Sequence, residues 1–436
     1  MSRVLLIGRG PLPSTEARTT SFSQLRTAHF YEALRSAGHE VRLALLGKSG
    51  APSLPPHWAE IIHVEEEGPG WLDTLTKLAE GSDLLVAAGP YNPSRAACLV
   101  AGDRPVWADL PGDPFAELHA LAQASNEPLS AERIAAAEAA ALPVLARADA
   151  ISVISNPQRH ALMGELGAVG RLLPGTLPNV HTIPIANPPG AATPPTPRAA
   201  GGPLVVALSG AFNPWFDDVT VARALQRALE NSPLISVVVT GGGLHGFYEE
   251  GYRRFERWAA QWPQRVRLLG WVPHGDLPEI LGQAHVGISM DRPGPEPELG
   301  SRTRLLSFVH HGLMPIATTG CELAQEMGRL GELVPMAVGD AASLSQALED
   351  MTQTDGSAQR RAVTAAQARL QTDYDARQLT SSLIEWSKNP TRTLPAELPA
   401  AALATQLAQE RDALAQVHTS PTWRTLSILH RLIRQD

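Results

Sequence analysis

The chain has 436 residues, 44% of them hydrophobic, which is enough for two or three domains with sizeable cores. A formal net charge of −8 argues against a nucleic-acid-binding protein that neutralises phosphates, and two cysteines are too few for a disulfide framework or a metal cluster. The apolar start at 4–7 is too short for a signal sequence and no stretch is long enough to span a membrane, so we expect a cytoplasmic protein.

The first half of the chain alternates between apolar runs and amphipathic stretches. The apolar runs predict buried strands at 4–7, 39–45, 84–88, 105–109, 150–154 and 179–185. The amphipathic stretches predict helices at 23–37, 71–80, 94–101, 130–148 and 157–166, the fourth kinked or broken at Pro143. Such alternation is typical of a parallel sheet with helices on its faces, so we predict one α/β domain over residues 1–186.

Residues 187–203 are rich in Pro, Gly and Ala and predict an inter-domain linker, because this composition cannot bury a face. Beyond it the alternation resumes, with strands predicted at 204–208, 235–240, 265–269, 285–290 and 315–319 and helices at 218–230, 301–311, 357–373 and 376–386. We predict a second α/β domain over 204–372, a crossover helix over 373–389 and a helical tail over 390–436.

The segment 285–319 has the most functional character. A buried strand is followed by a Pro- and Gly-rich loop at 291–300, for which we predict no regular structure, and then by a helix that Gly312 ends. Ligands bind at the carboxyl ends of parallel strands, and helix N-termini bind anions. Ser301 can cap this helix, while Arg302 and Arg304 can bind an anion in its first turn. The alternative is a solvated first turn with two surface arginines.

The run Leu-Gly-Ser-Arg-Thr-Arg-Leu-Leu-Ser-Phe-Val-His-His-Gly-Leu-Met-Pro at 299–315 resembles the nucleotide-sugar-binding segment of retaining GT-B glycosyltransferases, specifically a bacterial branch of family 4. The resemblance implies two Rossmann-like domains that face each other across a cleft, with the donor bound by the second. In the wider family a Glu of this helix binds the donor ribose, and Ser307 stands at that position here. An earlier Glu of the family motif aligns with Leu299 of this chain. Glu298 could take the role of that Glu only if the alignment is shifted by one residue.

Gly-rich loops follow two predicted strands of the second domain and let backbone amides approach a diphosphate. They contain Gly210, Asn213, Gly241 and Gly242. The resemblance adds Trp271 and Val272, with the Val272 backbone at the nucleobase and Trp271 as a stacking wall; the alternative for Trp271 is ordinary packing. The family's basic residue after the first loop is missing here, so we assign binding of the diphosphate to Arg302.

Two carboxylates in the first domain, Asp109 and Asp113, flank a Pro-Gly turn at the end of a predicted strand. They could orient a sugar hydroxyl or assist proton transfer. The alternative for each is the capping of backbone amides, which is common for Asp in such turns. Many family members have a His-containing segment here, but this chain has no His in the turn.

The resemblance implies transfer of a sugar from a nucleotide-sugar donor to a glycan or lipid-linked acceptor, with retention, in cell-surface polysaccharide synthesis. The leaving diphosphate would take the acceptor proton, Arg302 and the amides of Ser301 to Thr303 would stabilise it, and no metal or other cofactor is expected. Two alternatives stay open. A nucleotide-sugar epimerase would use Asp109 and Asp113 as acid and base, and a degenerate binding module without turnover is suggested by Ser307 and the missing basic residue.

The end of the chain, residues 420–436, predicts a basic amphipathic helix that starts at Ser420-Pro421. Its Ser-Pro-Thr-Trp-Arg start resembles a tail found after glycosyltransferase modules in bacterial polysaccharide enzymes. Such a helix suits peripheral contact with an anionic membrane surface, where lipid-linked acceptors lie. The alternative is that the apolar stripe docks on the protein itself or on a second subunit.

Overall fold

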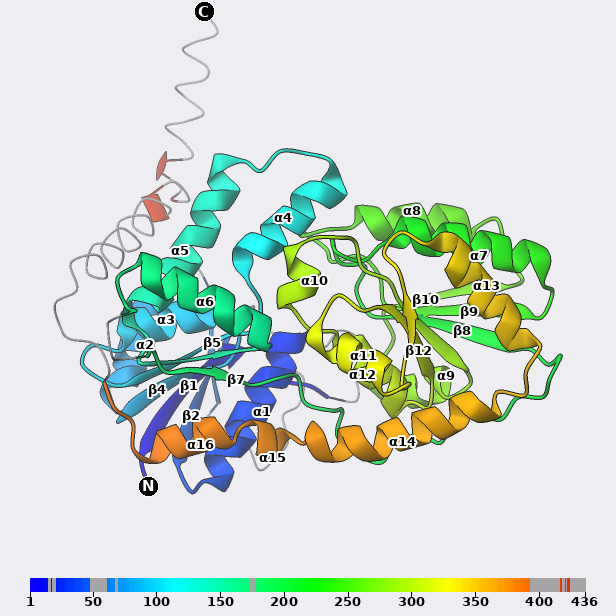
Figure 1. Ribbon diagram of the computed structural model, residues 1–436. Coiled ribbons are helices and arrows are strands. Elements are labelled where there is room, and N and C mark those ends of the chain that lie inside the picture. Colours follow the sequence, from blue (N-terminus) through cyan, green and yellow to red (C-terminus); the bar gives the residue numbers. More distant parts are fainter. Residues whose placement is uncertain are drawn as a thin grey trace, which may run out of the picture.

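The structure is a computed structural model that describes residues 1–14, 17, 21–47, 61–66, 70–172, 177–392, 416–417, 420 and 422–423. The first half of the chain forms a seven-stranded parallel sheet in the order β3-β2-β1-β4-β5-β6-β7 (Figure 1). Its strands are β1 (Arg3–Arg9), β2 (Glu40–Leu46), β3 (Ile61–Val64), β4 (Leu84–Ala87), β5 (Val106–Leu110), β6 (Ala150–Val153) and β7 (Val180–Thr182).

Helices cover both faces of this first sheet. They are α1 (Phe22–Ser36), α2 (Trp71–Glu80), α3 (Asn92–Val100), α4 (Pro114–Ser125), α5 (Ala131–Arg147) and α6 (Asn156–Ala168). Side chains alternate across a strand, so Leu5 and Ile7 of β1 pack into one core with α2 and α3, while Val4 and Leu6 pack into another with α1.

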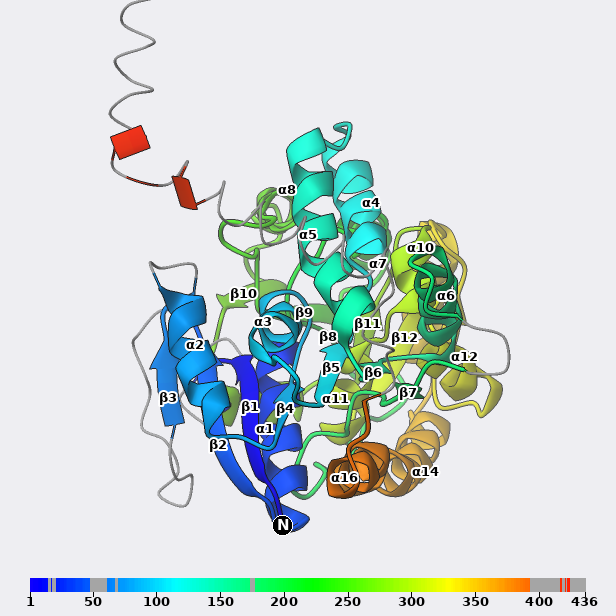
Figure 2. The same ribbon diagram turned by 90° about the vertical axis from the view of Figure 1, so that its left-hand side faces the viewer.

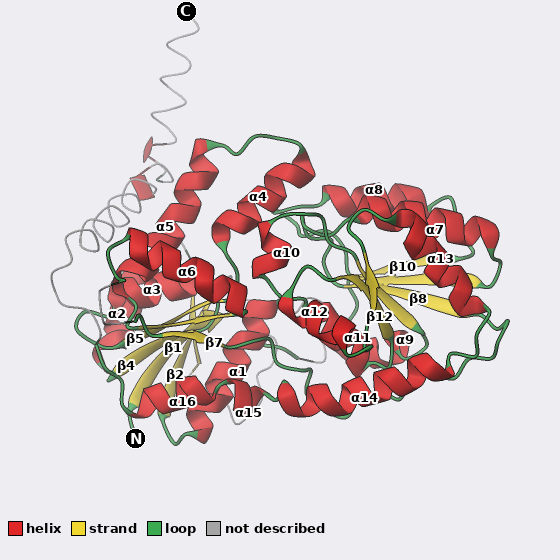
Figure 3. Cartoon of the chain, in the orientation of Figure 1, coloured by secondary structure: helices red, strands yellow, loops and turns green. Residues whose placement is uncertain are grey.

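The second half forms a six-stranded parallel sheet in the order β10-β9-β8-β11-β12-β13 (Figure 3). Its strands are β8 (Leu204–Ser209), β9 (Ile235–Thr240), β10 (Val266–Gly270), β11 (Val286–Ser289), β12 (Met314–Thr318) and β13 (Val334–Met336). Its helical segments are α7 (Asp218–Asn231), α8 (Glu250–Ala259), η1 (His274–Asp276), α9 (Leu277–Leu281), α10 (Pro295–Leu299), α11 (Thr303–His310), α12 (Glu322–Arg329) and α13 (Ala341–Thr352).

Each sheet has a point where the strand order reverses. In the first sheet β1 lies between β2 and β4, and in the second β8 lies between β9 and β11. At such a point the loops after neighbouring strands leave toward opposite faces and open a crevice at the carboxyl edge, which is where open α/β sheets bind ligands. The fold therefore places a candidate site at the ends of β8, β9 and β11.

The chain crosses between the two halves twice, and the two crossings lie side by side. The linker runs along α14 (Ser357–Asp373), with the Asn187 amide 2.9 Å from the Tyr374 carbonyl and Gln367 Nε2 2.8 Å from the Thr193 carbonyl. Beyond α14, the short helices α15 (Ala376–Leu379) and α16 (Ser381–Lys388) return to the first domain and pack against α1 (Figure 1).

Several sequence expectations about single elements were wrong. The loop at 291–300 contains the helix α10, which begins at Pro295, where a missing N–H does no harm. Helix α11 has Arg302 at its N-cap position and no side-chain cap, so Ser301 does not cap it. Helix α5 continues through Pro143. The elements that were not predicted are β3, α4, α8, η1, α9, α12, β13 and α13.

Most of the tail lies outside the described residues, including the predicted helix of 420–436 apart from positions 420, 422 and 423. The structure therefore does not bear on membrane contact or docking by that segment. Within the described part of the chain, no helix combines the length and the apolar character needed to cross a bilayer.

Candidate functional site

Three glycine turns are stacked at the carboxyl edge of the second sheet. Gly210 and Gly241 follow β8 and β9, and Gly270 ends β10; their φ values of 94°, 93° and 64° are a left-handed conformation that favours glycine. The Gly241 amide donates to the Gly270 carbonyl at 2.7 Å, and a Cβ on Gly241 would lie 2.2 Å from the Gly210 carbonyl oxygen. A Cβ on Gly210 would meet nothing within 4 Å. The turns thus support one another and leave space above Gly210.

Arg304 lies beside these turns, in the first turn of α11. Its Nη2 donates to the Ala211 carbonyl at 2.7 Å, and its guanidinium carbon is 5.0 Å from the centre of the Phe216 ring. Burial lowers the pKa of Arg304 to about 10, so it is still a cation at neutral pH. Within the described part of the chain it forms no ion pair with a carboxylate. A cation beside glycine turns and a helix N-terminus suits a diphosphate.

Arg302, which the sequence analysis assigns to the diphosphate, has a different environment. Its Nε is 2.9 Å from both carboxylate oxygens of Asp291, and its Nη2 is 2.7 Å from Glu296 Oε2. Burial opposes the charge of Arg302, but these two carboxylates outweigh that effect and raise its pKa. The anion expected beside Arg302 is thus supplied by the protein itself. The geometry does not support a direct contact from Arg302 to a phosphate.

The other predicted donor-side residues lie around the same edge. Thr303 begins α11 and Ser301 precedes it, both half-buried, while Ser307 is on α11 one turn beyond Arg304 with Oγ 3.4 Å from His311 Nδ1. Glu298 is exposed on α10, and the buried carboxylate of that helix is Glu296.

The residues assigned to the nucleobase side follow β10. Trp271 is half-buried and its Nε1 donates to the Gly243 carbonyl at 3.4 Å, while a Cβ on Gly242 would be 3.3 Å from the same nitrogen. Trp271 therefore packs against the second glycine loop, in line with the packing alternative. Val272 and Asn213 are half-buried, and the Asn213 carbonyl accepts from the Phe216 amide at 2.9 Å.

Asp109 is fully committed to internal contacts. It is completely buried, with Oδ1 2.8 Å from Arg26 Nη2 and Oδ2 3.0 Å from the Gly89 amide, and Ser152 Oγ donates to it at 2.6 Å. A carboxylate with this many partners holds the first-domain loops together and is not free to orient a sugar or transfer a proton. The proposed acid/base role of Asp109 does not fit this geometry.

Asp113 occupies the N-cap of α4 and accepts from the Ala116 amide at 2.6 Å, which is the capping alternative predicted from the sequence. It also contacts Glu165. Burial, together with the charge of Asp113 and a hydrogen bond to it, raises the pKa of Glu165 to about 8. Glu165 therefore keeps its proton at neutral pH beside Asp113.

A pair that the sequence reasoning missed lies where the first domain meets α10. The Tyr91 hydroxyl donates to Glu117, and burial is the main cause that raises the pKa of Glu117 to about 7. Glu296 of α10 is close enough to raise it further. Tyr91 has φ of 61°, a strained value for a residue with a side chain. No motif marks Glu117 in the sequence; only the Gly-Pro before Tyr91 hints at a special turn.

Helix α10 joins the two domains at this point. It lies against α4 and α6 (Figures 1 and 2). Ser155 Oγ donates to the Leu299 carbonyl at 2.5 Å, and nearby Asn156 Nδ2 donates to Glu322 Oε1 at 2.8 Å. The carboxyl edges of the two sheets are thus bridged by specific contacts on one side of the site.

The architecture of this chain is similar to that of proteins with solved structures. No protein-family model and no curated protein matches the chain, but solved structures do. HepE of Anabaena in complex with UDP-glucose has a TM-score of 0.62 at 14% identity, over 89% of this chain and 100% of that one. The chain has the GT-B fold. Its predicted fold class is confirmed.

Two further GT-B structures extend the comparison. Sucrose-phosphate synthase from Thermosynechococcus elongatus gives a TM-score of 0.61 at 15% identity, over 89% of this chain and 98% of that one. An alpha-glucosyltransferase in complex with UDP-glucose and DNA has a TM-score of 0.57 at 12% identity, over 89% of this chain and 100% of that one. At these identities the likeness establishes the fold alone, so residue roles rest on the geometry of this chain.

The geometry gathers the donor-side candidates and separates them from the acceptor-side ones. The glycine turns, Arg304 and the start of α11 share one edge, whereas Asp109 is enclosed inside the first domain. Among the described residues, no group of three His, Cys, Asp or Glu side chains is arranged to hold a metal ion.

Proposed function

We propose that this protein is a glycosyltransferase that moves a sugar from a nucleotide-sugar donor to a glycan or lipid-linked acceptor. The observation that carries the proposal is Arg304, a cation without a carboxylate partner among the described residues, beside stacked glycine turns at the carboxyl edge of a GT-B second sheet. Neighbours of the same fold, such as HepE, hold UDP-glucose, which supports a nucleotide-sugar as the donor.

In this proposal the donor diphosphate lies above Gly210 and contacts Arg304 and the free amides at the start of α11. Negative charge grows on the diphosphate as the bond to the sugar breaks. Contacts with Arg304 therefore strengthen in the transition state, and interactions of this kind raise the rate. Arg302 acts indirectly, because its ion pairs with Asp291 and Glu296 hold α10 and the start of α11 in place.

We propose retention of the anomeric configuration on the basis of the resemblance of the 299–315 segment. The leaving diphosphate takes the acceptor proton, so no protein base is required. On the first-domain side we place the acceptor hydroxyl near Tyr91 and Glu117, which face α10, in place of Asp109 and Asp113. A role in cell-surface polysaccharide synthesis, and membrane contact through residues 420–436, belong to the same proposal.

The test is incubation of the full chain with UDP-glucose and other nucleotide-sugars, followed by chromatography of the nucleotides. Slow hydrolysis or transfer releases the nucleoside diphosphate, which is the expected result. A module that only binds would show affinity for the nucleotide without release. An epimerase would convert the sugar to its epimer while the sugar stays attached to the nucleotide, so no nucleoside diphosphate would be released. Either of the last two outcomes, obtained across the panel, would overturn the transferase proposal.

A further inference from the structure

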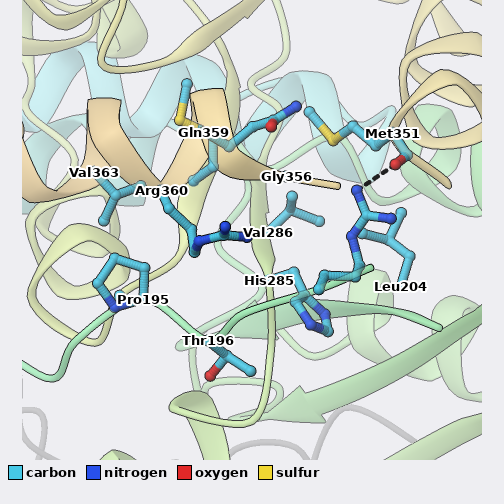
Figure 4. Close-up of a pocket in the computed structure, with 13 residues that line it drawn as sticks. Pro195, Thr196, Leu204, His285, Val286, Met351, Gly356, Gln359, Arg360 and Val363 are labelled. Atoms are coloured by element: carbon cyan, nitrogen blue, oxygen red, sulfur yellow. Dashed lines mark hydrogen bonds between the residues drawn. The ribbon is translucent and has the colours of Figure 1, made fainter. Parts of the chain in front are cut away.

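A pocket lies at the amino edge of the second sheet, opposite to the edge that carries the glycine turns. The pocket is open to solvent, and it is lined by the amino ends of β8, β11 and β12, by the linker and by the start of α14. Figure 4 shows Arg360 and His285 among the residues that surround it. The donor site, the glycine turns and α11 contribute no contact residue to it apart from Gly312, which follows α11.

Arg198 of the linker has a donor nitrogen without a hydrogen-bond partner in this pocket. It is only 9% exposed, its Nη2 donates to the Met351 carbonyl, and the same nitrogen is 3.4 Å from Thr354 Oγ1. Its Nη1 is buried and has no hydrogen-bond partner among the described residues. A buried cationic donor without a partner is costly, so an acceptor that reached Nη1 would stabilise this region.

A second guanidinium meets the first above the start of α14. A Cβ built on Gly356 would lie 3.6 Å from Arg360 Nη1 and 3.7 Å from Arg198 Nη2. Arg360 Nη1 donates to the Asp355 backbone carbonyl at 2.8 Å, and neither arginine forms an ion pair with a described carboxylate. Two neighbouring cations repel each other, and an anion between them would remove that repulsion.

Two further donors surround the same space. Gly356 is the N-cap of the 17-residue helix α14 and supplies no side-chain cap. Asp355 Oδ1 accepts from the Ser357 amide, and the following amides of the first turn remain available. His285 Nδ1 accepts from the Val205 amide at 3.0 Å, which places its proton on Nε2 as a donor. The negative charge of Asp355, whose carboxylate lies 2.9 Å from the Ser357 amide, also acts on Arg198 and Arg360.

We propose that this pocket is a binding site for a phosphate group, either inorganic phosphate or a small phosphate monoester. The two guanidinium groups, the His285 Nε2–H and the N-terminal amides of α14 form a cluster of donors with few acceptors of their own. The site joins the linker to the first turn of α14. A bound phosphate would therefore hold together the two chain segments that connect the domains.

The experiment measures thermal unfolding of the full chain in sodium phosphate against sodium chloride of equal ionic strength, with calorimetric titration of phosphate. We expect a saturable rise in Tm with phosphate. Arg360→Met should weaken phosphate binding at least tenfold, whereas Arg361→Met, which removes the same charge from the exposed neighbouring position, should not. Arg198→Met should act like Arg360→Met, but Arg360→Met is the main variant because Arg198 also supports the Met351 carbonyl.

A variant of the donor edge separates this site from the proposed diphosphate site. Arg304→Met should keep the phosphate response. If Arg304→Met abolishes it and Arg360→Met does not, phosphate binds at the glycine turns and the inference is wrong. A wild-type response no larger than that in chloride would also overturn it. Titration with glucose 6-phosphate and with inorganic phosphate compares the two ligands. Tighter binding of glucose 6-phosphate would indicate that the natural ligand is a phosphate monoester.

Discussion

Arg302 and Arg304 are two positions apart on one helix start and have opposite environments. Arg302 is enclosed by Asp291 and Glu296, whereas Arg304 contacts only a backbone carbonyl and an aromatic ring among the described residues. A paired buried cation mainly preserves structure, while an unpaired one is free to bind an anion. The sequence alone cannot distinguish them, because the carboxylates that pair with Arg302 come from a loop and a helix whose positions the fold decides.

Arg304→Met should lower the affinity for UDP-glucose and the rate of UDP release by about tenfold to a hundredfold, since a charged hydrogen bond contributes about 1.5–3 kcal/mol. Its Tm should change little. Arg302→Met should instead lower the free energy of unfolding by about 3–5 kcal/mol, because it leaves two buried carboxylates unpaired. Calorimetric titration and urea denaturation measure the two effects. A similar loss of binding in both variants at unchanged stability would contradict the assignment.

Glu117 should make the stability of the fold depend on pH. Burial raises the pKa of Glu117 from 4.5 to about 7, so the folded state binds its proton more tightly than the unfolded chain does. This contribution to stability is complete below pH 4.5 and is lost as the pH rises through 7.

Glu117→Gln cannot ionise but can still accept the Tyr91 hydrogen bond. As the pH rises from 5 to 8, its free energy of unfolding should increase relative to that of the wild type by about 2–3 kcal/mol. Urea denaturation at both pH values measures the gain. Glu165, with its pKa near 8, titrates over the same range in both proteins, so the difference between them isolates Glu117. Glu127→Gln, at an exposed position, is the control and should show no gain.

At the scale of elements, the predicted strands of both sheets are present, and so are the predicted helices from α1 to α14. Parallel strands that are buried on both faces give continuous apolar runs, which are easy to recognise. Two of the missed elements have weak signals: β3 has only four residues, and α10 is a short helix with two prolines. Since α10 carries Glu296, missing it also meant missing the partner of Arg302.

The candidate site was predicted in outline from the same kind of signal. Glycines after strands predicted the turns at Gly210 and Gly241, because positive φ is a local property that glycine reports. The states of Asp109, Glu117 and Arg302 depend on partners that are distant in sequence, such as Arg26 for Asp109. No local pattern can show which carboxylate is already paired.

Alanine substitutions in the glycine turns should separate support of the fold from ligand binding. Gly241→Ala pushes a Cβ against the Gly210 carbonyl, so both stability and UDP affinity should fall. Gly210→Ala has the same positive φ without any contact, so it should lose about 1 kcal/mol of stability from backbone strain alone. If the donor lies above Gly210, the new methyl group of Gly210→Ala should also weaken UDP binding at least tenfold relative to the wild type. Unchanged UDP binding by Gly210→Ala would place the diphosphate elsewhere.

At the scale of the whole molecule, α16 fastens the end of the second crossing to the first domain. Leu383 and Trp386 of α16 are buried there, and the Trp386 ring is 5.5 Å from that of Trp107. His39 Nε2 is 2.9 Å from Ser387 Oγ in the same contact. The first domain thus completes one face of its core with a helix from the far end of the chain.

Trp386→Ala should therefore lower the free energy of unfolding by about 3–5 kcal/mol, the usual cost of removing a large buried aromatic side chain. Intrinsic tryptophan fluorescence during urea denaturation measures it. Lys388→Ala, at an exposed position of the same helix, is the control and should change little. An equally small effect of both substitutions would show that α16 is not needed for the stability of the first domain.

The position of α10 has a consequence for the timing of turnover. Because this helix belongs to the second domain but lies against α4 and α6, the domains cannot separate without breaking the Ser155–Leu299 and Asn156–Glu322 hydrogen bonds. For the proposed glycosyltransferase activity, we expect this separation to limit release of the nucleotide product, so that product release is slower than the chemical step. Asn156→Ala should then shorten the residence time of UDP in stopped-flow dissociation.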